Sequence, residues 1–418
     1  MTGARLQPAT FDSVRARNRI SVPAEIATTT SAQARPRLSG RLMRIPPTSR
    51  MGPSASTASP SRATIAAAPR TSVGTGGRPP ASSTTTRPYA APAARAGGWV
   101  ASPFVRAILV VNPVATTTTV KTRNVLARAL ASELKVDVVE TTHRGHGHEL
   151  AEQARRDGLD VVVALGGDGT INEVVNGLLS AGPGPDVPRL AAVPGGSTNV
   201  FTRALGLSRD PIEATAEILD LLRADQTRLI SLGKADERWF TFTSGLGFDA
   251  DVIARVERRR AAGRRSSAGL YVRAAVTEFL TGPGRRHPHL TVEVPGQPPM
   301  SGVFLCLVSN VNPWTYVRSW PVAPSPEASL DAGLDVIAMR KVGVVRMLSH
   351  VRQSMRPGRG PKGSRLLSAH DVDWVRLRAE SPLDWQVDGD WAGHRQELTL
   401  RSIPNALRVV AAPAPLDQ

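Results

Sequence analysis

The chain has 418 residues, with 52 Lys or Arg against 35 Asp or Glu and a formal net charge of +17. The excess charge is uneven, because the first 100 residues hold 14 Arg and no Lys against only Asp12 and Glu25. No run reaches the roughly 18 apolar residues that span a bilayer, and the single cysteine, Cys306, excludes an internal disulfide. These features exclude a membrane-spanning helix and a disulfide scaffold, and they indicate a reducing cytoplasm.

Residues 1–100 consist mainly of Ala, Ser, Thr, Pro, Gly and Arg, with few side chains able to form a core. We predict a disordered, basic, low-complexity tail. A transit peptide would need an amphipathic helix, which the many prolines disfavour. Two other interpretations of this tail stay open. It could tether the protein electrostatically to anionic lipid or nucleic acid, or it could be extra sequence from an upstream start codon.

From residue 104 onward, apolar runs of strand length alternate with helical patterns. The expected strands cover 107–111, 136–139, 161–165 and 190–193, and the expected helices cover 120–134, 147–156, 170–179, 198–205 and 211–222. Such alternation is typical of a doubly wound parallel sheet with helices on both faces. We therefore predict an α/β domain at residues 104–230.

Beyond residue 230 the pattern changes to short strands separated by turns. The expected strands cover 227–232, 239–243, 290–294, 303–308, 334–339, 372–377, 384–387 and 397–401, and one helical stretch covers 250–280. This predicts an antiparallel β-sandwich domain at 231–412, whose last strand could return to the first domain. Cys306 should be a buried hydrophobe in the run 303–308.

Two glycine loops carry the strongest chemical signal. The first follows the strand 161–165 and opens a helix, and the second does the same after the strand 190–193. Glycines let the backbone approach a polyphosphate, the helix N-terminus offers free N–H groups, and Asp168 could reach a magnesium ion on the phosphates. Glycine is also common in strand-to-helix turns, but two such loops from neighbouring strands favour a nucleotide site.

In order and spacing, these segments resemble the catalytic domain of diacylglycerol kinases and sphingosine kinases. The matching segments continue through 245–250, 330–335 and 388–390, so the resemblance covers residues 105–410. It implies ATP and Mg²⁺ as cofactors. The implied nucleotide-binding residues are Asn112, Pro113, Thr142, Gly166, Gly167, Asp168, Gly169, Thr170, Asn172, Gly196, Ser197 and Asn199.

Phosphoryl transfer needs a carboxylate that takes the proton of the attacking hydroxyl. Asp388 and Asp390 flank Gly389, and in an extended segment their side chains could point the same way, whereas a type I′ turn is the alternative. The resembling family has Asp-Gly-Glu here, which implies Asp390 at the glutamate position with Asp388 as its partner. With Asp168, these are our candidate catalytic residues, and which aspartate abstracts the proton stays open.

A structural magnesium site in the resembling family uses two adjacent acids before the glycine at Gly333. Here those positions hold Asp331 and Ala332. The site is therefore either absent or rebuilt from Ser329, Asp331 and the Leu334 carbonyl, with Asp168 as a separate candidate ligand.

Two further groups of side chains could be either functional or simply exposed to solvent. His143, His146 and His148 could suggest metal, but solvated histidines at a helix entry fit better. The basic stretches at 255–265 and 356–365 could hold anionic headgroups or could be solvated faces.

We therefore predict a cytoplasmic, peripherally membrane-associated lipid kinase that converts diacylglycerol to phosphatidic acid. The expected partners are the lipid and an anionic membrane surface, without nucleic acid, and a homodimer is left open. A sphingoid-base or ceramide kinase, an NAD kinase, and a catalytically weak lipid-binding protein are the alternatives.

Overall fold

The structure is a computed structural model that describes residues 105–261, 268–282, 290–317 and 319–413. The predicted tail at 1–100, residue 104 and part of the basic stretch at 255–265 lie outside these residues. Among the helices described, none is long and apolar enough to cross a membrane.

Four parallel strands form the first part of the sheet. They are β1 (Arg106–Val111), β2 (Lys135–Glu140), β3 (Val161–Gly166) and β4 (Arg189–Pro194), in the order β4-β3-β1-β2. Every residue of β3 is buried, as expected for a parallel strand covered on both faces. The carboxyl ends of β1, β3 and β4 therefore lie at one edge, where α/β folds bind ligands.

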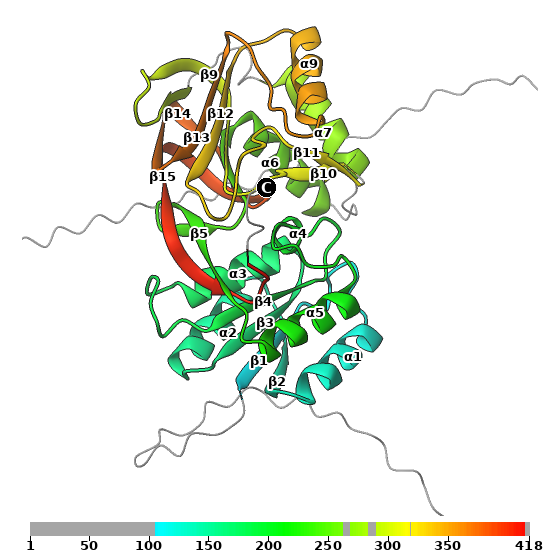
Figure 1. The fold of residues 1–418 in the computed structure, drawn as a ribbon. Helices are drawn as coiled ribbons and strands as arrows, with labels where there is room; N and C mark the ends of the chain where they lie inside the picture. Colours follow the sequence, from blue (N-terminus) through cyan, green and yellow to red (C-terminus); the bar gives the residue numbers. More distant parts are fainter. Residues whose placement is uncertain (1–104, 262–267, 283–289, 318, 414–418) are drawn as a thin grey trace, which may run out of the picture. The chain divides into compact units, whose positions relative to one another are not determined.

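Five helices connect or follow these strands: α1 (Val120–Ala131), α2 (His146–Arg156), α3 (Asp168–Leu178), α4 (Val200–Ala204) and α5 (Pro211–Arg223). Helix α1 packs against α5, and α2 packs against α3 (Figure 1). Helix α5 begins after Asp210, whose side chain accepts hydrogen bonds from the N–H groups of Ile212 and Glu213, and Pro211 occupies its first turn. We call β1–β4 with these helices the parallel region.

The remaining strands are mostly antiparallel. They are β5 (Arg228–Ala235), β6 (Arg238–Phe240), β7 (Thr243–Gly247), β8 (Leu290–Glu293), β9 (Met300–Ser309), β10 (Thr315–Val317), β11 (Trp320–Val322), β12 (Leu334–Arg340), β13 (Leu366–Val372), β14 (Trp374–Val387) and β15 (Asp390–Val409). Strands β7 and β8 each pair with both β9 and β14, so these four form a closed ring of pairings. A second apolar core, including the fully buried Cys306, lies among these strands. We call them the antiparallel region.

The 20-residue strand β15 joins the two regions. It pairs with β14 and β5 along its length, and Val409 near its end pairs with Leu190 of β4 in parallel. Of the strands described, thirteen therefore share one hydrogen-bonded network, and only β10 and β11 form a separate pair.

Among the described residues, the helices of the antiparallel region are α6 (Phe248–Ala261), α7 (Ala268–Thr281) and α9 (Val344–Ser354). Phe248, Phe279 and Phe304 cluster where α6, α7 and β9 meet, and Met347 of α9 packs on the same cluster. Neither α9 nor the pair β10 and β11 was expected from the sequence.

The mixed α/β class is confirmed. Two strand predictions need correction, because 239–243 is divided between β6 and β7, and 372–377 crosses the break between β13 and β14. The pairing pattern does not by itself divide the antiparallel region into two facing sheets. The sandwich arrangement and the boundary at residue 230 therefore stay predictions.

Candidate active site

The first glycine loop leaves β3 and enters α3 at the ligand-binding edge of the parallel strands. A β-carbon added at Gly166 would lie 2.6 Å from the Thr170 side chain, so only glycine fits there. The Thr170 hydroxyl in turn accepts a hydrogen bond from Asn112 Nδ2 at 2.8 Å. The loop after β1 and the loop after β3 are therefore fixed to each other.

The second glycine loop, after β4, packs directly on the first. The Gly195 N–H donates to the Gly166 carbonyl at 2.7 Å, and a β-carbon at Gly196 would lie 2.7 Å from Gly167 Cα. Part of the glycine requirement thus comes from the contact between the loops. The same contact places the two loops side by side at the ends of β3 and β4, the edge where α/β folds bind phosphate groups.

Asn199 shapes the second loop internally. Its φ of 50° is left-handed, and its side chain both accepts from the Gly196 N–H and donates to the Gly196 carbonyl at 2.8 Å.

Ser197 and Pro113, two other predicted nucleotide-binding residues, are exposed in their loops. The buried Thr118 hydroxyl near Gly195 has no hydrogen-bond partner.

Asp168 links the two loops. Its Oδ1 accepts a hydrogen bond from the Phe201 N–H at 3.1 Å, in the first turn of α4, where the carboxylate serves as the helix cap. Burial raises the pKa of Asp168 to about 6, with a smaller contribution from the charge of Asp388, while hydrogen bonds from the α4 backbone oppose the shift. Asp168 is therefore a carboxylate at the junction of the two loops whose charged form is disfavoured by burial.

Asp388 and Gly389 occupy the turn between β14 and β15, with φ values of 49° and 77°. Two consecutive positive φ values define the type I′ turn, so the extended arrangement with both aspartates on one side is wrong. In this turn the two carboxylates have different surroundings.

Asp388 is 5% exposed and accepts hydrogen bonds from five donors. These are the N–H groups of Thr241, Phe242 and Thr243, the Thr241 hydroxyl and Asn172 Nδ2, at 2.7–3.0 Å. Burial raises the pKa of Asp388, and the backbone hydrogen bonds pull it back. Since every partner donates, the site suits a charged carboxylate that holds α3, β6, β7 and the turn together.

Asp390 has the surroundings of a reactive carboxylate. Its side chain is 29% exposed and forms an ion pair with Arg144 Nη2 at 3.2 Å. A β-carbon placed on Gly169 would lie 3.3 Å from Asp390 Oδ2, so this carboxylate lies against the first glycine loop. Of the two aspartates in the turn, Asp390 is the one that an entering hydroxyl can reach.

Thr142 and Arg144 lie in the loop between β2 and α2. The Thr142 hydroxyl hydrogen-bonds His143 and His146, and Glu173 of α3 accepts from the N–H groups of Gly145 and Gly147. This holds the loop against α3 with Arg144 pointing to Asp390. His143 stacks on His146 and is exposed, and no metal-binding group of acids, histidines or cysteines occurs in the part of the chain that the structure describes.

The residues proposed for a structural magnesium site do not fit one. Asp331 is in a two-contact ion pair with Arg228, whose Nε donates to Oδ1 at 3.0 Å, and the Ser329 hydroxyl accepts from the Asp331 N–H. A guanidinium thus holds the only carboxylate of the set, and Leu334 is buried. We derive no function from a metal at this position.

The sequence predictions missed Arg144, Thr241 and Thr118. Arg144 stands among three histidines that drew attention to metal binding, and its partner is 246 residues away. Asn172, expected to bind nucleotide, donates to Asp388 and to the Trp239 carbonyl and so joins α3 to the antiparallel region.

Two contacting glycine loops lie at the carboxyl edge of a parallel sheet, and an accessible carboxylate lies against one of them, an arrangement suited to phosphate binding and proton transfer. This combination is that of a phosphotransferase acting on a hydroxyl group.

Comparison with known proteins agrees with this class. The family model of the diacylglycerol kinase catalytic domain matches residues 106–235. A diacylglycerol kinase of Bacillus subtilis is 26% identical over 258 residues, which is 60% of this chain and 78% of that protein. One from Staphylococcus haemolyticus is 24% identical over 65% of this chain and 77% of its own length.

A solved structure of a diacylglycerol kinase from Bacillus anthracis has a TM-score of 0.56 at 18% identity. The match covers 76% of this chain and 100% of the solved structure, which supports the mixed α/β fold. Residues 106–235 thus match the diacylglycerol kinase catalytic domain, and this match together with the kinase relatives supports a lipid kinase enzyme.

Proposed function

We propose that the protein transfers the γ-phosphate of ATP to a hydroxyl group of diacylglycerol, giving phosphatidic acid, at the surface of a membrane with which it associates peripherally from the cytoplasm. The observation that carries the proposal is the position of Asp390, a partly exposed carboxylate against Gly169 of the first glycine loop.

In the proposed reaction, the glycine loops bind the nucleotide phosphates through their backbone N–H groups. Asp390 accepts the proton of the lipid hydroxyl, the hydroxyl oxygen bonds to the γ-phosphorus, and the bond from that phosphorus to the ADP oxygen breaks. Arg144 orients Asp390 through the ion pair. Asp388 acts as a positioning residue because its oxygens are fully engaged by donors.

Magnesium enters as part of the nucleotide substrate, where it neutralises phosphate charge. Such ions usually keep several waters and take only one or two protein carboxylates, and Asp168 at the junction of the two loops fits that requirement. The Thr118 hydroxyl, buried and unpartnered beside Gly195, is a further donor that phosphate oxygens could use.

Diacylglycerol is favoured because the relatives in Bacillus subtilis and Staphylococcus haemolyticus are named diacylglycerol kinases. A sphingoid base or ceramide would use the same chemistry with a different acyl pocket. The test is radiolabelled phosphate transfer from ATP, in mixed micelles, to diacylglycerol, sphingosine, ceramide, undecaprenol and NAD.

Labelling of diacylglycerol supports the proposal, and labelling of another lipid replaces the substrate while keeping the mechanism. Labelling of NAD alone would overturn the lipid acceptor. If no acceptor were labelled while lipid binding persisted, the protein would be a lipid-binding relative without turnover.

A further inference from the structure

Helix α9 presents an aliphatic stripe to solvent. Val344, Val345, Leu348 and Val351 are 45%, 84%, 63% and 45% exposed. Their spacing of one, four and seven residues puts them on one face, while Met347 and His350 face the protein. Single exposed aliphatic residues are ordinary, but four in one stripe indicate a surface that is covered in use.

The chain around this helix has no acidic residue from position 336 to position 370. Over the same span the basic residues are Arg340, Lys341, Arg346, Arg352, Arg356, Arg359, Lys362 and Arg365. Within the described residues, no carboxylate forms an ion pair with any of these eight. The surface therefore combines aliphatic side chains with uncompensated positive charge.

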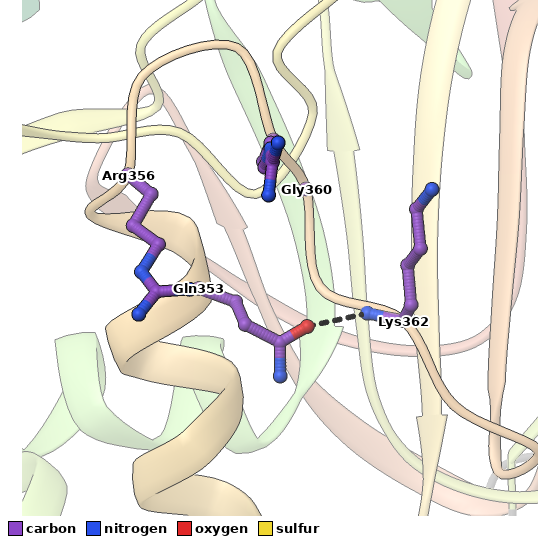
Figure 2. Close-up of a pocket in the computed structure, with 5 residues that line it drawn as sticks. Gln353, Arg356, Gly360 and Lys362 are labelled. Atoms are coloured by element: carbon purple, nitrogen blue, oxygen red, sulfur yellow. Dashed lines mark hydrogen bonds between the residues drawn. The ribbon is translucent and has the colours of Figure 1, made fainter.

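A hollow of about 400 Å³ lies at the C-terminal end of α9 and is lined by Gln353, Arg356, Arg359, Gly360 and Lys362 (Figure 2). The Lys362 N–H donates to Gln353 Oε1 at 3.0 Å, which ties the following loop to the helix. A β-carbon on Gly360 would lie 2.8 Å from the Pro324 carbonyl oxygen, so the loop also packs closely on its other side. Three basic residues thus line this hollow, and the loop that carries them is held in place by packing and a hydrogen bond.

Helix α7 adds two more exposed aliphatic residues, Val276 and Leu280, one turn apart. Phe279 of α7 and Met347 of α9 belong to one apolar cluster, so both helices pack on the same part of the core. Both helices therefore present aliphatic side chains outward while sharing buried contacts.

We propose that α9 and the basic loop after it dock the enzyme on an anionic phospholipid bilayer. The stripe of Val344, Val345, Leu348 and Val351 enters the boundary between headgroups and acyl chains, and the hollow at Arg356 and Lys362 takes a lipid phosphate. The membrane-docking proposal rests on the proposed lipid kinase function, because it identifies the surface through which that enzyme would reach its lipid. An amphipathic helix with basic residues beside an aliphatic face is the physical pattern of interfacial binding.

Two other occupants fit less well. Nucleic acid would use the positive charge but would leave the aliphatic stripe exposed to water. A second copy of the chain would cover the stripe but would place two acid-free surfaces against each other, which costs electrostatic free energy.

The test is sedimentation of the full chain with vesicles, without ATP or substrate, at low and high salt. The vesicles are phosphatidylcholine alone or with phosphatidylglycerol. The stripe variant is V345Q/L348Q and the hollow variant is R356Q/K362Q. The matched controls are I212Q on the exposed part of α5 and R128Q on α1, which keep α9 intact.

We expect the stripe variant to lose about tenfold in affinity for anionic vesicles, because two aliphatic side chains no longer leave water. The hollow variant should lose about fivefold per removed cation at low salt and little at high salt. The controls should match the unmodified chain. All variants should keep phosphate transfer in detergent micelles, because none of the altered side chains belongs to the glycine loops or to the surroundings of Asp390.

Unchanged vesicle affinity in both variants would overturn the proposal and leave membrane binding to other segments. Loss of a concentration-dependent dimer in V345Q/L348Q, or loss of duplex DNA binding in R356Q/K362Q, with vesicle binding intact, would also overturn it in favour of those partners. Failure of phosphate transfer by the unmodified chain in micelles would instead count against the proposed function, since vesicle binding is measured without turnover.

Discussion

Asp388 and Asp390 lie two positions apart in one turn, yet their surroundings assign them different roles. Asp388 accepts from five donors and has no access for a substrate, whereas Asp390 has one ion-pair partner and an exposed edge. General-base catalysis needs a carboxylate that can take up a proton from a bound hydroxyl. At the scale of single residues, this favours Asp390 as the base.

We therefore expect Asp390→Asn to lower kcat by about 10²–10⁴-fold, because an amide cannot accept the hydroxyl proton. The melting temperature should change little, since the side chain is partly exposed and its one ion pair is near the surface. Asp390→Glu should keep at least about a tenth of the activity, because the carboxylate is retained. The measurement is phosphate transfer in micelles with thermal melting alongside, and near-normal kcat in Asp390→Asn would refute the assignment.

Sequence reasoning located both aspartates but could not separate them. An Asp-Gly pair is compatible with either an extended segment or a type I′ turn, and only the turn points the two side chains in different directions. Arg144, the partner of Asp390, is 246 residues away, and such a pairing depends on the whole fold.

At the scale of elements, the glycine loops are a packed unit. Gly167 and Gly196 approach so closely that a side chain on either would push the loops apart. The distance between the backbone N–H groups of the two loops is therefore set by the absence of β-carbons.

Gly196→Ala should weaken ATP binding at least tenfold and destabilise the fold by about 1–3 kcal/mol, because its β-carbon would lie 2.7 Å from Gly167 Cα. Gly343→Ala is the matched control, since a β-carbon there meets nothing within 4 Å. Nucleotide titration and urea unfolding measure the two effects. Equal ATP affinity in Gly196→Ala and the unmodified chain would show that the loop contact does not shape the nucleotide site.

Helix α6 carries a partly buried acid, Asp251, next to β14. Burial raises the pKa of Asp251 to about 8, and the charges of Asp384 and Glu278 add to the shift. Asp384 accepts from Trp391 Nε1 and lies 3.1 Å from His394 Nε2, which fixes its carboxylate beside Asp251.

The folded chain therefore holds the Asp251 proton at pH values where the unfolded chain has released it. Because the folded state binds more protons between about pH 4 and pH 8, stability falls as pH rises through this window, by up to about 1.4 kcal/mol per pH unit. Asp251→Asn should remove this contribution. Urea unfolding at pH 6, 7 and 8 should give a flatter profile for Asp251→Asn than for the unmodified chain.

The exposed Asp137→Asn serves as the control and should follow the unmodified profile. Asp168 and Asp249, whose pKa values burial raises to about 6, contribute mainly below the chosen range. Parallel profiles for Asp251→Asn and the unmodified chain would mean that Asp251 is charged in the folded state.

The elements of the parallel region could be predicted from the sequence because their strands are continuous apolar runs and their helices alternate with them. Helix α9 could not, because its aliphatic stripe faces solvent and its buried face holds His350 and Ser354. A hydrophobic pattern indicates a core only when the apolar face is the buried one. The long strand β15 was expected only at 397–401, because its exposed residues interrupt the apolar alternation.

At the scale of the whole molecule, two features connect the regions. Strand β15 pairs with β14, β5 and β4, and Asp388 joins the turn before β15 to Asn172 of α3. Neither region therefore has an independent sheet, and the candidate base lies at the beginning of the strand that links them. The geometry of the active site should depend on both regions being folded at once.

Asp388→Asn tests this dependence. Its new amide would face N–H and O–H donors in place of a carboxylate, and we expect a loss of about 3 kcal/mol in stability. Because Asp388 touches both regions, fluorescence of Trp385 in β14 and hydrogen exchange of β3 should report the same lowered midpoint in urea. Asp390→Asn, which breaks only a surface ion pair, should leave both midpoints unchanged. Separate midpoints for β3 and Trp385 in Asp388→Asn would instead mean that the two regions unfold independently, and that β15 does not couple them.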